Sequence, residues 1–164
     1  QRSLAAAVIL ATVPGLRFFN DGQLEGRHIR LPVQLTREPD EVIDVGIRHF
    51  YYRLMEVTNA PVFHEGEWSL VEVNETAQDN QSYSKLLAWS WRSAEQLKIA
   101  IVNYSPQPAQ GWLKLPPVLK TSEKYEIRDG LTDKVYPWAS GELTTRGLYI
   151  DLAPLQAHIL EIVY

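Results

Sequence analysis

The stretch Leu148-Tyr149-Ile150-Asp151-Leu152 places a large aliphatic residue at every second position. Successive side chains of a β-strand point to opposite faces, so this alternation predicts a strand with one buried face and with Tyr149 and Asp151 on the other. The same period occurs in three more segments, at 87–91, 97–101 and 160–164. The pattern therefore predicts a sheet-forming protein over much of the chain.

Turn-forming residues separate these segments. Gly, Asn, Asp, Ser and Pro cluster at 65–66, 93–95, 106–111, 129–130, 140–141 and 146–147. Together the alternation and the turns predict about eight short strands, with no helix between them. This is typical of a mainly β fold, an antiparallel Greek-key-type β-sandwich.

The first 60 residues have a different pattern. Ser3 can cap a helix over residues 4–13, which the Pro14-Gly15 pair ends. Residues 16–19 then predict a short strand, and 23–37 a loop. A single strand beside helices cannot bury its own apolar surface, so this segment predicts neighbours outside the chain.

A second helix is predicted to begin at Glu38-Pro39, with the proline in its first turn, and to reach residue 57. Apolar residues fall at helical spacing on one face of this segment, at Ile43, Ile47, Phe50, Tyr51 and Leu54. We therefore divide the chain near Asn59-Ala60-Pro61 into residues 1–60, a helix-strand-helix segment of an α/β unit, and residues 61–164, the sandwich.

Composition excludes several classes of function. The chain has 164 residues, 45% hydrophobic and 22% charged, as is ordinary for a globular protein. The net charge is −4, and no basic cluster provides a footprint for nucleic acid or an anionic membrane. There is no cysteine, which excludes disulfides and suits a cytosolic protein, although secreted proteins can also lack it. The first apolar run, residues 4–11, is too short to span a bilayer and is expected to be an internal helix of something longer.

The order of these elements resembles a known family. Residues 12–26 contain a helix that ends in Pro14-Gly15, the aromatic segment 16–19 and the motif Gly22-Gln23-Leu24-Glu25. This is similar to the entry into the last barrel strand of the α-amylase superfamily of glycoside hydrolases, where a Gly-Gln-Glu motif follows the strand. Here Leu24 is inserted into that motif.

Later segments carry the same resemblance. Tyr52-Arg53-Leu54 and Gly66-Glu67-Trp68 resemble the final barrel helix and the strand that follows it. Residues 129–136 and 147–160 resemble the hairpin and closing strands of the family's C-terminal domain. The resemblance covers nearly the whole chain and implies that residues 1–60 are a remnant of a (β/α)8 barrel, followed by a C-terminal antiparallel β-sandwich.

The resemblance also implies an activity for the parent protein, as an α-amylase-type glycoside hydrolase or transglycosylase acting on α-glucans. Retaining enzymes of this type use two carboxyl groups about 5–5.5 Å apart. The family's catalytic acids lie on the fourth, fifth and seventh barrel strands. If residues 16–19 form the eighth, those acids precede Gln1, and we expect no catalytic residue in this chain and no cofactor. The expected partners are an α-glucan or oligosaccharide, bound through the parent enzyme, and the preceding barrel of the same polypeptide.

Two groups of residues are candidates for sugar contact. In a barrel, the loop after a strand faces the active site. Five polar residues of that loop are therefore candidates: Asn20, Asp21, Gln23, Glu25 and Arg27. The alternative is turn chemistry for residues 20–22 and an ion pair between Glu25 and Arg27.

The second group is aromatic. Trp112, Tyr136 and Trp138 are candidates to stack on sugar rings, whereas Trp89 and Trp91 sit among leucines and are predicted to pack in the core. The four histidines are scattered without metal-site spacing, so we expect no metal.

A free-standing carbohydrate-binding or interaction module of sandwich fold is the alternative function. The helix-strand-helix segment distinguishes the two hypotheses, since a binding module has no use for it. If residues 1–60 belong to a barrel, their apolar surface is expected to drive self-association or to dock onto the sandwich.

Overall fold

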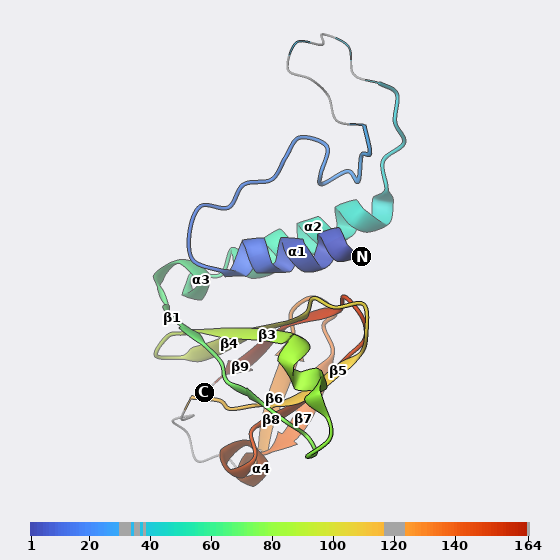
Figure 1. The fold of residues 1–164 in the computed structure, drawn as a ribbon. Helices are drawn as coiled ribbons and strands as arrows, with labels where there is room; N and C mark the ends of the chain where they lie inside the picture. The colour runs from blue at the N-terminus through green and yellow to red at the C-terminus, as the bar shows by residue number, and fades with distance from the viewer. Residues whose placement is uncertain (30–33, 35–36, 38, 117–123, 164) are drawn as a thin grey trace.

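The computed structural model describes residues 1–29, 34, 37, 39–116 and 124–163. A layer of helices lies on one β-sheet, and a second sheet lies beneath the first (Figure 1). The helical elements are α1 (Arg2–Thr12), α2 (Val45–Thr58), α3 (Val62–Glu65), the 3-10 helix η1 (Gln81–Lys85) and α4 (Ser140–Thr145). The strands are β1 (Glu67–Leu70), β2 (Val73–Asn74), β3 (Leu86–Arg92), β4 (Gln96–Asn103), β5 (Ala109–Leu113), β6 (Lys124–Asp129), β7 (Val135–Ala139), β8 (Leu148–Leu152) and β9 (Ala157–Val163).

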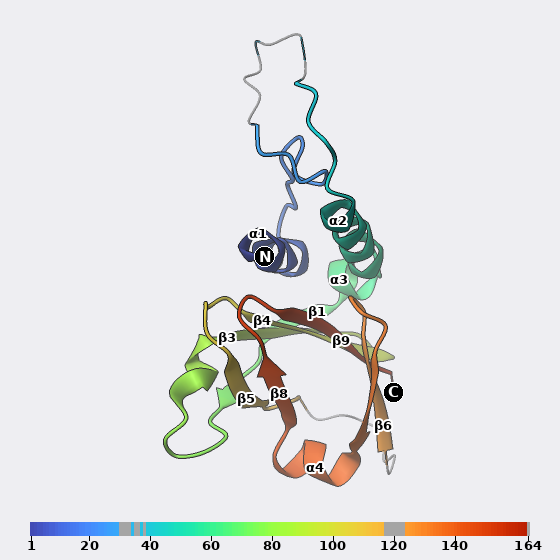
Figure 2. The same cartoon turned by 90° about the vertical axis from the view of Figure 1, so that its right-hand side faces the viewer.

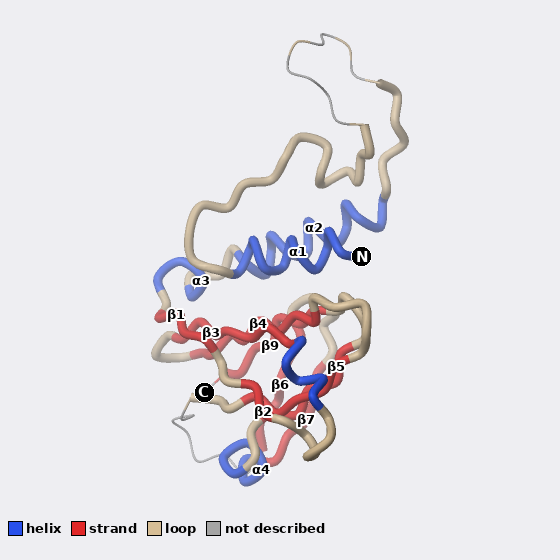
Figure 3. Tube along the Cα trace, viewed as in Figure 1, coloured by secondary structure: helices blue, strands red, loops and turns tan. Residues whose placement is uncertain are grey.

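The strands form two antiparallel sheets, one of six strands in the order β1-β3-β4-β9-β6-β7 and one of three in the order β2-β5-β8. In the described residues every strand lies after residue 66 (Figure 3). The sequence prediction of a mainly β, antiparallel sandwich preceded by helices is confirmed. On β4 the inner face is the predicted one, because Leu97, Ile99 and Ile101 are fully buried in the core between the sheets. On β3 the predicted face lies outside that core: Trp89 and Trp91 pack against the helices, and Leu87 is 46% exposed.

Strand β4 is buried on both faces, which period-two alternation alone does not predict. Ala100 and Val102 point away from the sandwich core and belong to a second apolar cluster, with residues of α1 and α2. Helices α1 and α2 lie side by side over this outer face of the six-stranded sheet (Figure 2). The buried side chains of α1 are mostly small (Ala5, Ala7, Val8 and Ala11), so the helix backbone can approach the sheet closely.

The helix boundaries differ from the predicted ones. Helix α1 begins at Arg2 with no side-chain cap, so Ser3 does not cap it. Helix α2 begins at Val45 and not at residue 38, because the Asp44 carboxylate accepts a hydrogen bond from the Ile47 amide at 3.0 Å and supplies the N-terminal cap. The part after Pro61 also contains the short helices α3, η1 and α4, where only strands and turns were predicted.

Residues 16–19 are not a strand in this structure. They run as extended chain between α1 and the loop that follows, and no ladder includes them. The side chain of Leu16 is 91% exposed and that of Phe18 67%. A strand requires a hydrogen-bonded neighbour, and the described part of the chain places none beside this segment.

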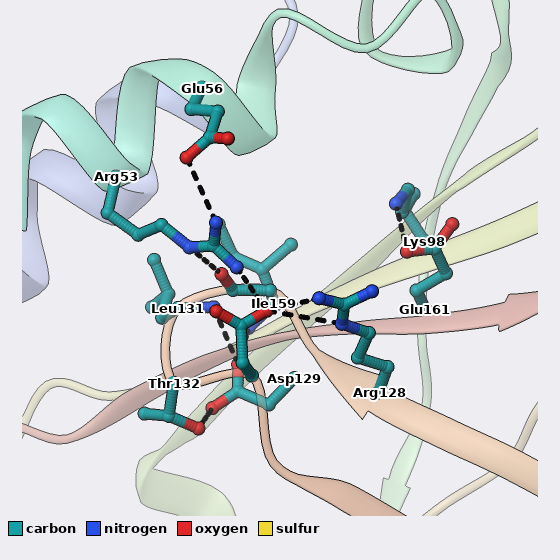
Figure 4. Close-up of polar contacts among 11 residues, drawn as sticks. Arg53, Glu56, Lys98, Arg128, Asp129, Leu131, Thr132, Ile159 and Glu161 are labelled. Carbon is teal, nitrogen blue, oxygen red and sulfur yellow. Dashed lines mark hydrogen bonds and ion pairs between the residues drawn. The ribbon is translucent and has the colours of Figure 1, made fainter.

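Arg53 of α2 joins the helical layer to the sandwich (Figure 4). Its Nε donates to the carbonyl oxygen of Gly130, just after β6, at 2.6 Å, and its guanidinium pairs with Asp133 in the same hairpin. Asp129 is fully buried beside this contact and accepts hydrogen bonds from the Thr132 hydroxyl at 2.6 Å and from the Leu131 amide at 3.1 Å. The hairpin turn that carries the two aspartates is therefore fixed against α2.

Candidate functional site

The loop after the extended segment borders a hollow of about 710 Å³. The start of α1 and the inner face of α2 complete its wall, through Ser3, Ile47 and Tyr51. Four of the five polar candidates line this hollow, namely Asn20, Asp21, Gln23 and Arg27. The fifth, Glu25, is not among the lining residues.

Two glycines shape the loop. Gly22 has φ +78° and Gly26 has φ +70°, values that side-chain-bearing residues rarely adopt. A Cβ on Gly26 would also lie 2.8 Å from Ile47 Cδ1 and 3.0 Å from Asp44 Cβ, and with φ at +70° it would strain the backbone, so glycine suits the close approach of the loop to α2. The Arg27 amide donates to the Gly22 carbonyl at 2.9 Å and closes the loop.

Gln23 holds the loop to the helices. Its Oε1 accepts from the Asn20 amide at 3.1 Å, and its Nε2 donates to the Tyr51 hydroxyl at 2.8 Å. Tyr51 is 1% exposed, with its ring edge-on to Phe19 and to Phe50. The side-chain oxygen and nitrogen of Gln23 thus each have a protein partner, and this side chain holds the loop against α2.

Glu41 is a residue of this region that the sequence did not single out as a site residue. Its carboxylate accepts from the backbone amides of His28 at 2.6 Å and Ile29 at 3.2 Å. The hydrogen bond from the His28 amide lowers the pKa of Glu41. Its neighbour Asp44 donates its amide to the Glu25 carbonyl at 2.9 Å. Glu41 and Asp44 therefore anchor the far end of the loop.

Asn20 and Asp21 are exposed at the rim of the hollow, while Arg27 is half-buried in its wall. These groups can exchange hydrogen bonds with a polyhydroxylated ligand. Asp21 is the one carboxyl group among the described residues that line the hollow, whereas glycoside hydrolysis needs a pair. The described lining of the hollow therefore does not supply such a pair.

The aromatic candidates lie elsewhere, in the sandwich. Tyr136 and Trp138 line a cavity of about 140 Å³ between β7 and β8. Trp112 does not line it. Its ring lies 5.2 Å from that of Tyr149 between centroids, with the Arg146 guanidinium 5.0 Å above it.

Trp89 and Trp91 are buried, at 4% and 6% exposure, which confirms that they pack in a core. The core in question is the one between the sheet and the helices. Tyr149 and Asp151 also line the small cavity, and sequence reasoning did not select them as site residues. The sequence did show that Tyr149 and Asp151 alternate with Leu148, Ile150 and Leu152. That pattern places the two residues on one face of the strand but does not predict a cavity there.

Within the described ranges no cluster of three or more His, Cys, Asp or Glu side chains is arranged to hold a metal ion. The helices of those ranges are all too short or too polar to cross a membrane.

Comparison by sequence finds no matching family model and no matching curated protein. Comparison by structure finds a maltogenic α-amylase, AmyB from Thermotoga neapolitana, with a TM-score of 0.76 at 15% identity over 100% of this chain and 37% of that one. The fold is that of the C-terminal region of α-amylases. The resemblance inferred from the sequence motifs is confirmed at the level of the fold.

Two further solved enzymes match in the same way. The α-amylase of Geobacillus thermoleovorans, solved with acarbose, gives a TM-score of 0.70 at 14% identity over 98% of this chain and 32% of that one. A debranching enzyme from Nostoc punctiforme gives 0.61 at 17% identity over 97% and 29%. The chain therefore spans about a third of the length of these solved enzymes.

Proposed function

We propose that this chain is the C-terminal part of an α-amylase-type retaining glycoside hydrolase or transglycosylase that acts on α-glucans. Residues 1–60 would form the end of its (β/α)8 barrel and residues 61–164 its C-terminal domain. The catalytic carboxylates would lie in the preceding part of the barrel. The shared fold and the solved complexes of its neighbours with acarbose, maltose and maltotriose support this proposal.

The observation that carries the proposal is the uncovered apolar surface of the helical half. Among the residues that the structure describes, ten large apolar side chains are exposed, and six of them precede residue 60: Leu16, Phe18, Ile29, Val42, Val45 and Tyr52. Leu16 and Phe18 lie on extended chain, where a parallel barrel strand would find its neighbours. This concentration in one part of the chain supports a helical half that another part of the protein covers.

In a barrel, residues that follow a strand at its C-terminal end face the active site. The loop from Asn20 to Arg27 follows the extended segment, so Asn20 and Asp21 would contact sugar hydroxyls. Gln23 would act indirectly, because its Nε2–Tyr51 hydrogen bond holds the loop in place. Glu25, which does not line the hollow, would contribute through its backbone contact with Asp44.

The sandwich would stabilise the end of the barrel. Trp89 and Trp91 of β3 both donate to the last residue of α1, and Arg53 of α2 reaches the hairpin after β6. These contacts join the two parts through two buried indoles and one partly exposed arginine. They also argue against a free-standing binding module, in which the outer face of the sheet would need no helical cover.

The test is the activity of the full-length protein on starch, glycogen, maltose and trehalose, with the 164-residue chain assayed beside it. We expect the full-length protein alone to act on an α-linked glucan. In that protein Asn20→Ala should raise KM with little change in kcat, whereas the exposed sandwich variant Asp79→Asn should match the wild type. A full-length product without the upstream barrel acids, or without activity on any α-glucan, would refute the proposal.

A further inference from the structure

The hollow of about 710 Å³ has a further polar lining residue, His28. The loop that carries His28 lies on the side of the helical layer away from the sandwich (Figure 1). The His28 side chain is 89% exposed, so a ligand can reach its ring. A histidine ring has two nitrogens, and the hydrogen-bond partner of one determines whether the other donates or accepts. The partner of each ring nitrogen therefore decides what His28 can bind.

Glu41 lies beside one of these nitrogens. Its Oε1 is 3.3 Å from His28 Nδ1 and also accepts the hydrogen bond of 2.6 Å from the His28 amide. Its Oε2 accepts from the Ile29 amide at 3.2 Å. The Glu41 side chain is only 17% exposed, and the hydrogen bond from the His28 amide lowers its pKa, so the carboxylate is charged at neutral pH. Two backbone amides thus hold a negative charge next to Nδ1 of the ring.

This contact determines the role of the second nitrogen, Nε2. A carboxylate beside Nδ1 favours the proton on Nδ1, so the neutral ring presents Nε2 as an acceptor. Among the residues that the structure describes, Nε2 of His28 has no hydrogen-bond partner. Because the ring is exposed and lines the hollow, this acceptor is open to a ligand there.

The neighbouring groups of the hollow narrow the choice of ligand. The Asp21 carboxylate and the neutral His28 ring at Nε2 both accept hydrogen bonds, so a ligand that spans them must donate. The Asn20 carboxamide offers a donor as well as an acceptor, so the same ligand can also accept. An anion would be opposed by Asp21, and an ammonium group donates without accepting. Hydroxyl groups both donate and accept, which fits a neutral sugar.

We propose that His28 is a ligand-binding residue of the hollow, whose Nε2 accepts a hydrogen bond from a sugar hydroxyl, and that Glu41 is a positioning residue that acts through His28. That the sugar belongs to an α-glucan rests on the proposed function. Glu41 is not among the described residues that line the hollow, so it acts without touching the ligand. Its role is to keep the proton of the ring on Nδ1 and the acceptor turned toward the sugar.

The state of the ring can be tested without a ligand. Nitrogen chemical shifts of the His28 ring in the 164-residue chain distinguish a proton on Nδ1 from a proton on Nε2, at a pH where the ring is neutral. We expect the proton on Nδ1 in the wild type. In Glu41→Gln the charge beside Nδ1 is gone, and the proton should move at least partly to Nε2. A wild-type ring that carries its proton on Nε2 would overturn the inference.

Binding is measured by calorimetry on the full-length protein, with a sulfur-linked maltotriose that resists cleavage as the probe. His28→Asn places an amide near the position of Nδ1 but none at Nε2, and it should weaken binding roughly two- to tenfold, the loss of one hydrogen bond. His28→Gln carries an amide oxygen that can reach the position of Nε2, and it should bind more tightly than His28→Asn. The matched control is His49→Asn, because His49 is exposed on α2 and does not line the hollow.

A double-variant cycle separates positioning from a purely structural role. Glu41→Gln should weaken binding of the probe in the wild-type background but not further in the His28→Asn background, because the ring through which Glu41 acts is absent there. Its effect on the free energy of unfolding should be the same in both backgrounds, since the amides of His28 and Ile29 lose the carboxylate in both. A purely structural role would weaken binding equally in the two backgrounds.

Unchanged binding in His28→Asn would overturn the inference, and so would a wild-type protein that does not bind the probe. Cleavage of an α-glucan by the full-length protein, together with unchanged binding in His28→Asn, would refute only this inference. Binding that depends on His28, in a full-length protein that cleaves or transfers no α-glucan, would refute only the proposed function.

Discussion

The indole Nε1 of Trp91 donates a hydrogen bond of 2.6 Å to the carbonyl oxygen of Thr12. Thr12 is the last residue of α1, where helix carbonyls have no partner within the helix. Trp89 Nε1 donates to the same oxygen at 3.0 Å. The sheet of the sandwich therefore caps a helix that lies 77 residues earlier in the chain, and this contact couples the stability of the two parts.

Replacing these indoles should show that coupling. Trp91→Phe alone should lower the free energy of unfolding by about 0.5–1.5 kcal/mol, because the Thr12 carbonyl keeps one donor. The double variant with Trp89→Phe leaves that buried carbonyl without an indole donor and should cost about 1–3 kcal/mol more than the sum of the two single changes. Urea denaturation of the four proteins of the cycle measures the difference.

Trp68→Phe is the matched control for this cycle. The Nε1 of Trp68 is buried without a hydrogen-bond partner among the described residues, so its removal should be neutral or stabilising. Additive effects at Trp89 and Trp91 would show that the shared carbonyl does not couple them.

The buried Asp129 should make stability depend on pH. Burial by itself raises the pKa of Asp129, but hydrogen bonds from His158 and Thr132 outweigh it and hold the pKa below its ordinary value of 3.8. A carboxyl with a lowered folded-state pKa contributes stability that is fully present above the unfolded value. That contribution is lost as the pH falls below 3.8 through the folded value.

Asp129→Asn should therefore flatten the acid limb of the stability profile and lower stability at neutral pH, where the charged hydrogen bonds are strongest. Unfolding free energies measured at several pH values above and below 3.8 test this expectation. The exposed Asp79→Asn is the control and should leave the profile close to that of the wild type. An unchanged acid limb in the Asp129 variant would contradict the prediction.

Replacing each of the two glycines near the ends of α4 by alanine should change the stability of the protein in opposite directions. Gly147 has φ +95°, and a Cβ there would lie 2.1 Å from the Leu113 carbonyl oxygen, so Gly147→Ala should destabilise by more than about 1 kcal/mol. Gly141 has open space around it within a helix, and Gly141→Ala should be neutral or stabilising by up to about 1 kcal/mol. Thermal unfolding of the two variants measures the difference. Equal effects on stability would show that the backbone conformation of Gly147 does not make glycine necessary there.

The exposed apolar residues of the helical half should drive self-association of the 164-residue chain. Leu16→Ser with Phe18→Ser should shift the sedimentation profile toward monomer and reduce binding of a hydrophobic dye, with little loss of stability, since both side chains are largely exposed. Leu70→Ser is the control, because Leu70 is 75% exposed on β1 of the sandwich. A wild-type chain that is already monomeric at high concentration would contradict this prediction.

The candidate site was predictable only in part. The positions of Asn20, Asp21, Gln23 and Arg27 in one loop follow from their closeness in the sequence, and they do line one hollow. That Gln23 is engaged by Tyr51, 28 residues away, depends on how α2 packs. The cavity between β7 and β8 depends on which strands end each sheet, and strand order is a long-range property.

The sequence by itself determined the sandwich, because period-two alternation between turn-forming residues indicates successive short strands. It also determined that residues 1–60 carry surplus apolar surface. Only the tertiary structure decided that β4 is buried on both faces, that α1 is capped by Trp89 and Trp91, and that residues 16–19 run without a ladder. The reason is physical: a side chain's face is set by local geometry, whereas hydrogen bonding between strands and packing between layers require a partner far away in the chain.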